Sequence, residues 1–506
     1  MKRSFIIWLT LLVIILLSTT MPLNQSVSAA SDYWPAADWR TSSPEEQGID
    51  SAKLYRMLAY IKENNIDIHS ILIIRHGYLV LESYFAPYDK DTIHNLKSVS
   101  KSYLSALVGI AFREKLLKGL DQKVADFFPE YFASGDDPRK KETTLRHLLT
   151  MTAGFNWAEN SPVSNGLWHS QNWVKYAIEM PMNDNPGEKF TYSTALTHLM
   201  SAILTKTSGM STQEFAEKYL LDSLGIDVKL WRRDPQGICF GGSELFLTPR
   251  DMAKFGYLYL RQGIWNGKPI VPADWIEQSV KGHVKTGNWG GFADYGYWWW
   301  LEPGSYAAEG WGGQRIVVVP DEDLVVVFTS ADFNQPRSLY EFFIKPAVKI
   351  GKIPANPKES AALAKLVAEL GHPQAKPVLP LPEIASQISG KTYQVEKNGF
   401  GITALRFDFK DGNQCLLTLD TPGGKLELPV GLDDLYRFSN EVSDVPVGFK
   451  GWWVGAGPIL EMNWLYLGEP FKYQGLFTFE GDEVRISVTV TPSNQFETVT
   501  GKAVVK

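Results

Sequence analysis

The chain has 506 residues, of which 13 % are aromatic, and 17 of these are Trp. This composition is typical of a folded globular protein with a sizeable core and excludes a disordered chain. The net charge is -6, and leaving out the two positive charges of Lys2 and Arg3 makes it about -8, so nothing points to a nucleic-acid partner.

The first 29 residues are typical of a signal peptide for export. Lys2 and Arg3 precede the apolar stretch FIIWLTLLVIILL, and Val27 and Ala29 suit cleavage before Ala30. Thirteen apolar residues are short for a membrane span, so we predict a cleaved signal and a secreted or periplasmic protein, with an uncleaved anchor as the alternative. With only two Cys residues in an exported chain, a disulfide scaffold is excluded.

Residues 30–353 alternate between helical and strand patterns in a way that predicts an α/β domain. Asp50 suits the N-cap of a helix beginning at Ser51, and HSILIIRHGYLVLESYFA predicts two strands with a tight turn at His76-Gly77. Residues from about 115 to 285 are mostly helix and loop, and strands return in YGYWWWLE, GGQRIVVVP and DLVVVFTS. We therefore predict one antiparallel sheet built from both ends of the domain, flanked by helices, with an all-helical subdomain inserted.

The remainder of the chain has a different residue pattern. Residues 354–382 hold six Pro residues around one short helix, which suits a linker. Residues 383–506 alternate between apolar and polar positions and carry Asp-Gly and Gly-Gly turns, which predicts a small C-terminal all-β domain, a barrel or a sandwich. This β-domain holds no catalytic motif that we recognise, so we expect it to be dispensable for the chemistry.

The stretch SVSKSYLSALVGIA raises the question of function. Ser98 stands at the start of an apolar helix, and Lys101 lies one turn further on the same face. A serine hydroxyl becomes a nucleophile when a base takes its proton, and burial lowers the pKa of a lysine amine toward that role. The chance alternative is a helix cap beside a solvated lysine; SVSK is, however, the only S-x-x-K in the chain.

Further stretches make a family resemblance specific. In order along the chain they are SPEEQGID, SVSKSYLSALVGIA, LRHLLTMTAGF, PGEKFTYST, GGSELFLTPRDMAKFGYLYL and GWGGQRIVVVP. Together they resemble the serine β-lactamase and penicillin-binding superfamily, in particular its class C-like branch with family VIII esterases and 6-aminohexanoate-dimer hydrolases. The resemblance implies a β-lactamase-like fold with the site between its two parts, acylation of Ser98 and assistance by Lys101.

Two more elements are implied by this resemblance. In PGEKFTYST, Tyr192 takes the place of the family's tyrosine base, while Thr194 stands where an Asn is usual and weakens a substrate-amide contact. In GWGGQRIVVVP, Trp311 replaces the lysine of a K-T-G triplet. Gly312 and Gly313 would leave room for substrate, and the N–H of Gln314 would complete an oxyanion hole with that of Ser98. An ordinary hairpin at these residues is the alternative.

Two literal matches compete with these assignments. Lys285-Thr286-Gly287 spells K-T-G and Ser170-Gln171-Asn172 spells S-x-N, so a pattern scan would assemble a penicillin-binding site from them. We reject both, because HVKTGNWGGFADYG lacks strand texture and LWHSQNWVKYA lacks the PGEKF turn.

The sequence thus predicts an exported serine hydrolase that cleaves an ester or a non-peptide amide through a Ser98 acyl-enzyme, without metal or cofactor. A cell-wall DD-peptidase, D-aminopeptidase or β-lactamase is one alternative, and a penicillin-binding sensor without turnover or a wall-binding protein is another. In family members with K-T-G, the lysine attracts a substrate carboxylate. Here Arg315, close to Trp311 in the sequence, is the residue that could restore such a carboxylate site. The partner expected is a small ester or amide; association with the cell envelope and the oligomeric state stay open.

Overall fold

The computed structural model describes residues 33–35, 38–132, 137–410, 412–491 and 495–503. The predicted signal peptide lies outside these residues. Within them, no helix combines the length and the apolar character needed to cross a membrane.

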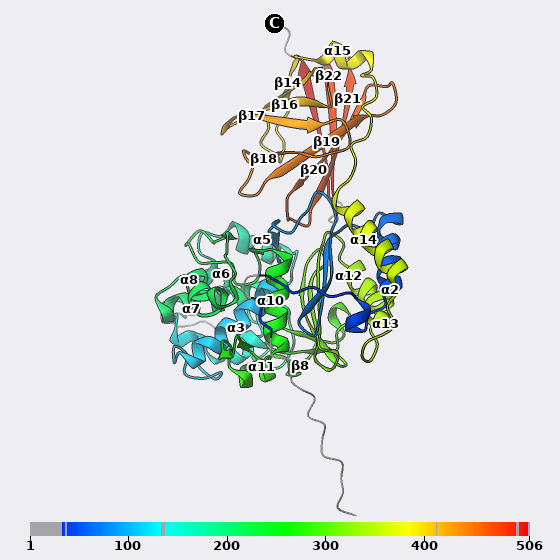
Figure 1. Ribbon diagram of the computed structural model, residues 1–506. Coiled ribbons are helices and arrows are strands. Elements are labelled where there is room, and N and C mark those ends of the chain that lie inside the picture. Colours follow the sequence, from blue (N-terminus) through cyan, green and yellow to red (C-terminus); the bar gives the residue numbers. More distant parts are fainter. Residues whose placement is uncertain (1–32, 36–37, 133–136, 411, 492–494, 504–506) are drawn as a thin grey trace, which may run out of the picture. The chain divides into compact units, whose positions relative to one another are not determined.

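An eight-stranded antiparallel sheet forms the centre of the first domain (Figure 1). In spatial order its strands are β2 (Tyr78–Tyr84), β1 (Ile68–Arg75), β13 (Leu324–Ser330), β12 (Gln314–Val319), β11 (Ser305–Gly310), β10 (Trp300–Glu302), β9 (Asp294–Tyr295) and β8 (Val284–Lys285). The turn between β1 and β2 falls at His76 and Gly77, both with positive φ, as a type I′ hairpin turn requires. Strands from both ends of the domain therefore pair, as predicted.

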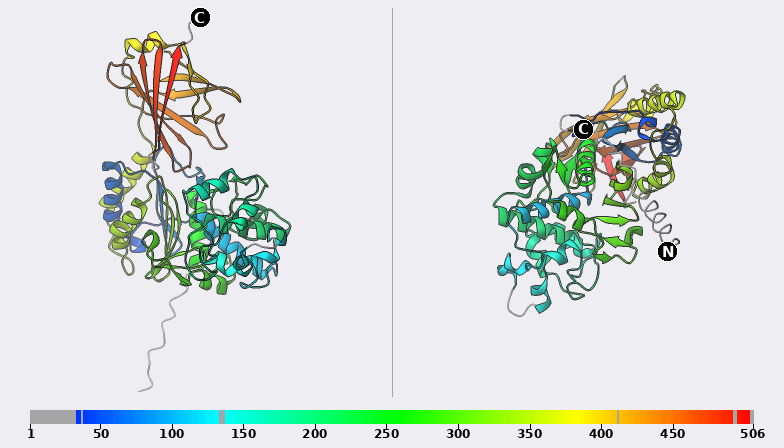
Figure 2. Two further views of the ribbon diagram at one scale, coloured as in Figure 1. Left: turned by 180° about the vertical axis from the view of Figure 1, so that it is seen from behind. Right: turned by 60° about the horizontal axis from the view of Figure 1, so that its bottom comes forward.

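Helices cover both faces of this sheet (Figures 1 and 2). One face carries η1 (Glu45–Gln47), α2 (Ser51–Glu63), α12 (Gln335–Leu339), η8 (Tyr340–Ile344), α13 (Lys345–Ala347) and α14 (Pro357–Gly371). On this side Leu54, Leu58 and Ile61 of α2 pack against β1, β12 and β13 in one apolar core. Asp50 caps α2 by accepting from the N–H of Ala52.

The opposite face carries two helices that connect the sheet to the helical subdomain. They are α10 (Pro249–Leu260), which packs on β12 and β13, and α3 (Val99–Arg113), which packs on β11. Gly256 of α10 allows this close packing, because a Cβ there would lie 2.7 Å from Val325 of β13. Since α3 begins next to the sheet and runs into the helical subdomain, its first turn lies between the two.

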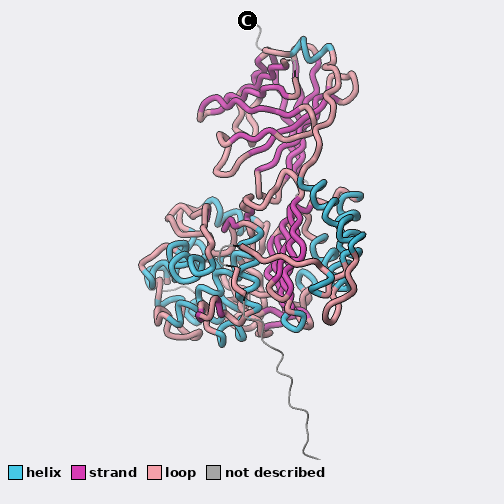
Figure 3. Tube along the Cα trace, viewed as in Figure 1, coloured by secondary structure: helices cyan, strands magenta, loops and turns pink. Residues whose placement is uncertain are grey.

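The helical subdomain is built mainly from short helices (Figure 3). They are η2 (Val124–Asp126), η3 (Pro129–Tyr131), η4 (Pro138–Glu142), α4 (Leu145–Leu149), α5 (Pro162–His169), α6 (Trp173–Glu179), α7 (Thr194–Ser208), α8 (Thr212–Ala216), η5 (Glu217–Leu221) and α9 (Asp222–Leu224). A small three-stranded sheet has the spatial order β3 (His94–Asn95), β5 (Leu245–Leu247) and β4 (Leu230–Trp231). The elements β6 (Ile264–Trp265), β7 (Lys268–Pro269), α11 (Ala273–Ser279), η6 (Trp289–Gly291) and η7 (Pro320–Glu322) complete the domain.

The segment expected to be a linker contributes a helix to the first domain. In α14, Leu363 and Leu366 are buried in the core beside α2, and Lys62 of α2 pairs with Glu369 at 3.1 Å. The rest of the linker leads to α15 (Glu383–Ile388), where the second domain begins.

The second domain is an all-β barrel. Its strands are β14 (Thr392–Val395), β15 (Ala404–Phe409), β16 (Gln414–Thr421), β17 (Gly424–Gly431), β18 (Arg437–Ser439), β19 (Val447–Trp453), β20 (Ile459–Tyr466), β21 (Lys472–Glu480), β22 (Glu483–Thr491) and β23 (Gln495–Ala503). Ten strands pair in the order β17-β16-β15-β14-β23-β22-β21-β20-β19-β18, and the pairing of β17 with β19 closes the sheet. The predicted fold class, a β-lactamase-like domain followed by an all-β domain, is confirmed.

Two fully buried histidines, His69 of β1 and His94 of β3, lie close to each other. The His69 ring stacks on Tyr88 at 3.8 Å between centroids and lies 5.4 Å from the ring of His94. Burial lowers the pKa of His94 to about 3, and burial followed by the neighbouring His94 and Lys472 lowers the pKa of His69 well below its usual range. Both rings are therefore neutral in the folded protein at neutral pH.

We predict that acid weakens the fold through these rings. The unfolded chain protonates them near pH 6.5 while the folded chain resists, so the free energy of unfolding falls as pH drops below about 6.5. His94 alone should cost about 2 kcal/mol between pH 7 and pH 5, and His69 acts in the same direction. Urea unfolding of wild type and His94→Gln at both pH values measures this, and an equal pH dependence in the two proteins would contradict it.

Candidate active site

Ser98 stands at the N-terminus of α3, where the backbone is unusual. It directly follows Lys97, a non-glycine residue with φ of 47°, and it is the N-cap of the helix. The Ser98 side chain makes no capping hydrogen bond and is partly exposed. Left-handed backbone at a non-glycine residue is uncommon and clusters at functional sites. The hydroxyl is thus free to bond elsewhere and accessible to a ligand.

Lys101 points its amine at Ser98 from one helical turn away. Its Nζ lies 2.8 Å from Ser98 Oγ, 2.8 Å from the carbonyl of Gly242 and 3.2 Å from Thr194 Oγ1. The side chain is 1 % exposed. Burial lowers the pKa of the Lys101 amine to about 8, against a smaller opposing effect of Glu159. A substantial fraction of the amine is therefore neutral at slightly alkaline pH, although three polar atoms surround it.

Glycines make the approach of the Gly242 carbonyl possible. A Cβ on Gly241 would lie 2.1 Å from the Thr197 carbonyl, and one on Gly242 would lie 2.4 Å from Thr197 Oγ1 and 3.1 Å from Lys101 Nζ. Any other residue at these two positions would push the loop away from α3 and α7. The GGSELF stretch therefore serves to hold an acceptor against the lysine.

Tyr192 meets the pair from the helical subdomain. The interaction of its hydroxyl with Ser98 acts to lower the pKa of Tyr192, and Lys101 Nζ lies 5.0 Å from its ring centroid. Trp289 stacks on the ring at 4.7 Å. The resemblance implied a tyrosine base here, but burial raises the pKa of Tyr192 well above its usual range, against the smaller opposing effect of Ser98. Tyr192 is therefore a neutral phenol that can pass a proton on.

Thr194 begins α7, two residues after this tyrosine. Its hydroxyl accepts from Lys101, and its backbone N–H donates to Glu159 at 2.7 Å. Glu159 also accepts from the Trp157 indole at 2.9 Å. A carboxylate at a helix N-terminus is favourable, so Glu159 fixes the start of α7. Thr194 thus contacts the lysine itself, a role we had not assigned to it.

Trp311, Gly312 and Gly313 form the turn between β11 and β12. Gly312 and Gly313 have φ of 79° and 86°, which favours glycine. A Cβ on Gly312 would lie 2.4 Å from Pro470, and one on Gly313 would lie 2.3 Å from the Asp332 carbonyl. These glycines serve the turn and its close contacts, whereas we had expected them to leave room for substrate.

Gly310, at the end of β11, lies against the two residues that precede the nucleophile. A Cβ there would lie 2.4 Å from the carbonyl of Leu96 and 3.3 Å from Lys97. β10 pairs with β11 only over Ser305–Ala307, so the last residues of β11 present a free edge toward α3. The Gly310 carbonyl accepts from Gly313 inside the hairpin, and in a trans peptide the N–H of Trp311 then points the opposite way, out of that edge.

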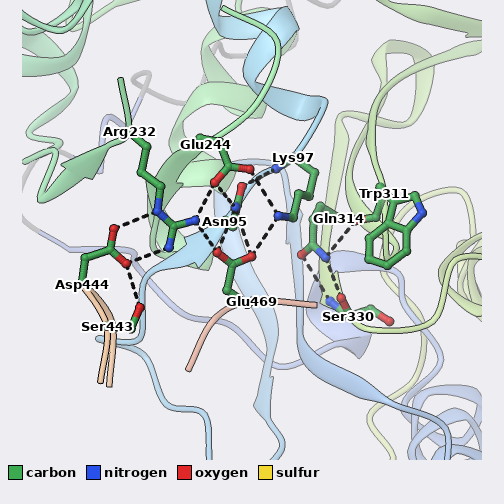
Figure 4. A network of polar contacts seen from close by, with 10 residues as sticks. All are labelled: Asn95, Lys97, Arg232, Glu244, Trp311, Gln314, Ser330, Ser443, Asp444 and Glu469. Carbon is green, nitrogen blue, oxygen red and sulfur yellow. Dashed lines mark hydrogen bonds and ion pairs between the residues drawn. The ribbon is translucent and has the colours of Figure 1, made fainter. Parts of the chain in front are cut away.

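Gln314 does not lie where we expected. It pairs with Gly310 in the ladder between β11 and β12, and its side chain donates to the Ser330 carbonyl at 2.6 Å (Figure 4). Its backbone is therefore in register with β11, and its side chain joins β12 to β13. The second oxyanion donor must be sought at the Trp311 N–H instead.

The two competing motifs lie elsewhere and are otherwise occupied. We had predicted no strand at Lys285, but this residue belongs to the short strand β8. That strand is the outermost one of the sheet. The Lys285 side chain is 80 % exposed and pairs with Asp294. Asn172 caps α6 by accepting from Lys175 N–H, and its amide donates to Tyr131. Among the described residues, neither Lys285 nor Asn172 forms a hydrogen bond with Ser98 or Lys101.

A network of charges connects the base of α3 to the β-domain (Figure 4). Lys97 Nζ lies 2.9 Å from Glu469 and 3.3 Å from Glu244, and Arg232 lies 2.6 Å from both carboxylates. Asn95 donates to the same two carboxylates and accepts from the Lys97 N–H at 3.0 Å. The network thus holds Lys97 in its left-handed conformation, immediately before Ser98.

The β20–β21 loop of the β-domain supplies Glu469 and also reaches the third element. Its Gly468 carbonyl accepts from Asn95 N–H, Pro470 touches Gly312, and the Phe471 ring lies 4.8 Å from that of Trp311. Glu469 is buried, and Asp444 of the same domain pairs with Arg232 at 2.8 Å. Without these carboxylates Lys97 and Arg232 would share Glu244 alone. The structure therefore argues against our expectation that the β-domain is dispensable.

Comparisons with known proteins agree with this architecture. The sequence profile of the family described as Beta-lactamase matches residues 60–343, more than half of the chain, so the chain belongs to that family. The chain is 25 % identical over 288 residues to the 6-aminohexanoate-dimer hydrolase of Paenarthrobacter ureafaciens, covering 52 % of this chain and 72 % of that protein. The match confirms the predicted superfamily, and the protein is a serine hydrolase.

Two further relatives are similar over parts of the chain. A Salmonella typhimurium protein named provisionally as a D-alanyl-D-alanine carboxypeptidase is 26 % identical over 239 residues, which is 42 % of this chain and 54 % of that protein. The solved structure of a Bacillus anthracis protein, provisionally named a 6-aminohexanoate-dimer hydrolase, superposes with a TM-score of 0.51 at 20 % identity, covering 61 % of this chain and 86 % of that one. At 20 % identity, the similarity to the Bacillus anthracis structure shows a shared fold only.

Several residues at the site were missed by the sequence analysis. They are Glu159, Gly242, Trp289, Glu469 and Phe471. Gly242 lies in a stretch that carries the family resemblance, so its glycine pair was a usable signal. Glu469 and Phe471 lie in the β-domain, and nothing in their local sequence distinguishes them.

We predict that catalysis depends on the neutral Lys101 amine. With its pKa lowered to about 8, kcat/KM for a p-nitrophenyl ester should rise from pH 6 and level off above about pH 8. Lys101→Arg keeps the charge but cannot lose its proton, so it should lose on the order of 10^3-fold or more, as Lys101→Ala should. Lys285→Ala is the matched control and should leave the rate unchanged; a Lys101→Arg enzyme with near-wild-type activity would refute this role.

We also predict that Glu469 positions the nucleophile. Glu469→Gln removes a buried carboxylate from Lys97 and Arg232, which should lower the free energy of unfolding by about 2 kcal/mol or more and kcat about tenfold, with little change in KM. Asp444→Asn is the control, since Asp444 is 43 % exposed and pairs with Arg232 at the edge of the network. Unchanged kcat in a destabilised Glu469→Gln protein would mean that the network only joins the domains.

Proposed function

We propose that this protein is an exported hydrolase that cleaves esters or non-peptide amides through an acyl-enzyme on Ser98. One observation carries the proposal: the buried Lys101 amine lies 2.8 Å from the Ser98 hydroxyl. A hydroxyl next to an amine whose pKa is lowered to about 8 is an activated nucleophile.

In the first step the neutral Lys101 amine takes the proton of Ser98 as Oγ attacks the substrate carbonyl. The C–O bond that forms converts the carbonyl oxygen into an oxyanion. Tyr192, which interacts with Ser98 and lies close to Lys101, then relays a proton to the leaving alcohol or amine as its bond to the carbonyl carbon breaks. In the second step water attacks the ester, with the same groups removing its proton, and Ser98 regains its own.

The oxyanion would be held by two backbone N–H groups. One is that of Ser98, since the first N–H groups of a helix have no partner within the helix. The other is that of Trp311, which points from the free edge of β11 toward α3 and replaces the Gln314 donor of our sequence analysis. Such preorganised donors typically contribute about 10^2-fold to 10^3-fold each in rate.

The charges around the site favour an uncharged acyl group. Trp311 stands where a K-T-G lysine would attract a carboxylate, and its ring packs with Phe471. The cations nearby are already paired, Lys97 with Glu469 at 2.9 Å and Arg315 with Glu309 at 2.7 Å. Arg315 is 1 % exposed and so cannot restore a carboxylate site, as we had considered.

Export rests on the sequence of residues 1–29 and on the composition of the chain. Its localisation outside the cytoplasm, and any association with the cell envelope, therefore remain part of the proposal. A cell fractionation with Lys2 and Arg3 replaced by neutral residues would test this part by itself.

We predict ester hydrolysis with little or no turnover of β-lactams. The measurement is kcat/KM for p-nitrophenyl butyrate beside nitrocefin, on wild type and on Trp311→Lys, which should shift the ratio toward the anionic substrate. A charge-assisted hydrogen bond is roughly twice as strong as a neutral one, so a several-fold shift is expected.

Two outcomes would overturn the substrate class. One is turnover of nitrocefin by the wild type that exceeds its ester hydrolysis. The other is efficient release of D-alanine from a peptide that ends in D-alanyl-D-alanine, which would favour the cell-wall peptidase. Labelling of the protein by a serine-reactive probe without turnover of any substrate would favour the sensor.

A further inference from the structure

The interior of the β-barrel is filled at one end and hollow at the other. Near α15 it is filled by large side chains, with Phe479 at 6.2 Å from Phe407 and 5.8 Å from Tyr393 between ring centroids. Toward the other end a cavity of about 170 Å³ remains. Protein interiors are normally close-packed, so a hollow of this size needs an explanation.

The lining of this cavity is apolar and follows the pleat of the strands. Leu417, Leu419 and Thr421 of β16 line it at every second position, as do Met462, Trp464 and Tyr466 of β20. Four residue steps of a strand span about 13 Å, so the cavity is long relative to its volume. Among the residues that the structure describes, none that lines the cavity is charged.

The strand directions show which end is open. In this antiparallel order the loops after β14, β16, β18 and β20 all lie at one end of the barrel. Asn398 and Phe400 from the first of these loops and Val442 from the third line the cavity, and Phe400 is 39 % exposed. The fourth loop carries Gly468 and Glu469, so the mouth opens at the end that meets the catalytic domain.

Two polar residues of the lining, Asn398 and Thr421, lie at this mouth and are engaged with their own loops. The Asn398 amide donates to the carbonyls of Glu396 and Ile402 at 2.8 Å each, and Thr421 Oγ1 donates to the Gly424 carbonyl at 2.9 Å. Neither group is left to bind a particular head group. The site can therefore recognise a chain and leave a polar head in solvent at the rim.

We infer that the barrel binds an amphiphile with one unbranched aliphatic chain of medium length, the chain inside the cavity and the head at its mouth. Apolar cavities of about 150 Å³ stay dry and bind apolar molecules, and small closed barrels have room for one such ligand. The elongated shape favours a chain over a compact ring. This inference does not depend on the reaction proposed for Ser98.

Calorimetric titration of the full-length protein with decanoate tests this site. Leu417→Trp fills the cavity, and Val488→Phe fills it less severely in case the first variant fails to fold. Leu476→Trp is the control, because Leu476 is 38 % exposed on β21, beside the lining residue Phe477. We expect both filling variants to weaken decanoate binding tenfold or more, the control to bind as wild type does, and decanol to bind like decanoate.

The same proteins should all hydrolyse p-nitrophenyl acetate at the wild-type rate, since Leu417 and Val488 lie outside the catalytic site. Absence of decanoate binding to the wild type would overturn the inference. So would binding that both filling variants retain, because the ligand would then occupy another site, and inhibition of acetate ester hydrolysis that persists in those variants would identify it as the catalytic one.

Discussion

The burial of one lysine amine is the constraint on which the site depends. Lys101 is held away from water by α3, α7 and the Gly241-Gly242 loop, and burial is what brings its pKa down to about 8. The same residues supply the acceptors that keep the amine within reach of Ser98. The sheet, the helical subdomain and the glycine loop can therefore be understood as the parts needed to enclose one base beside one nucleophile.

A second constraint acts on the backbone before the nucleophile. Lys97 adopts a left-handed conformation, and its side chain is held by carboxylates from two domains. Buried charges are costly to leave unpaired, so Glu469 of the β-domain stabilises both the domain contact and the turn that presents Ser98. The catalytic motif lies within a few residues of the chain, but the support for its geometry comes from more than 370 residues away, as the separation of Asn95 and Glu469 shows.

The catalytic motif is local in the sequence, whereas its support comes from distant residues, and this contrast explains how much could be predicted from sequence. The sheet followed from strand patterns at both ends of the domain, and the pairing of Ser98 with Lys101 followed from their spacing on one helix. The Trp311 N–H could not be singled out as a donor from sequence, because its direction depends on which carbonyl closes the hairpin. The neutral state of Tyr192 and the contribution of Glu469 also escaped us, since burial and contacts between domains are properties of the folded chain.

The central claim is that Ser98 is the residue that becomes acylated. Mass spectrometry of the full-length protein after reaction with a fluorophosphonate tests it most directly, with peptide mapping to locate the adduct. We predict a single adduct on Ser98 that forms faster as the pH rises toward 8, and Ser98→Ala protein that remains unlabelled and inactive toward esters. An adduct on another serine, or a Ser98→Ala enzyme that hydrolyses esters at the wild-type rate, would contradict the account.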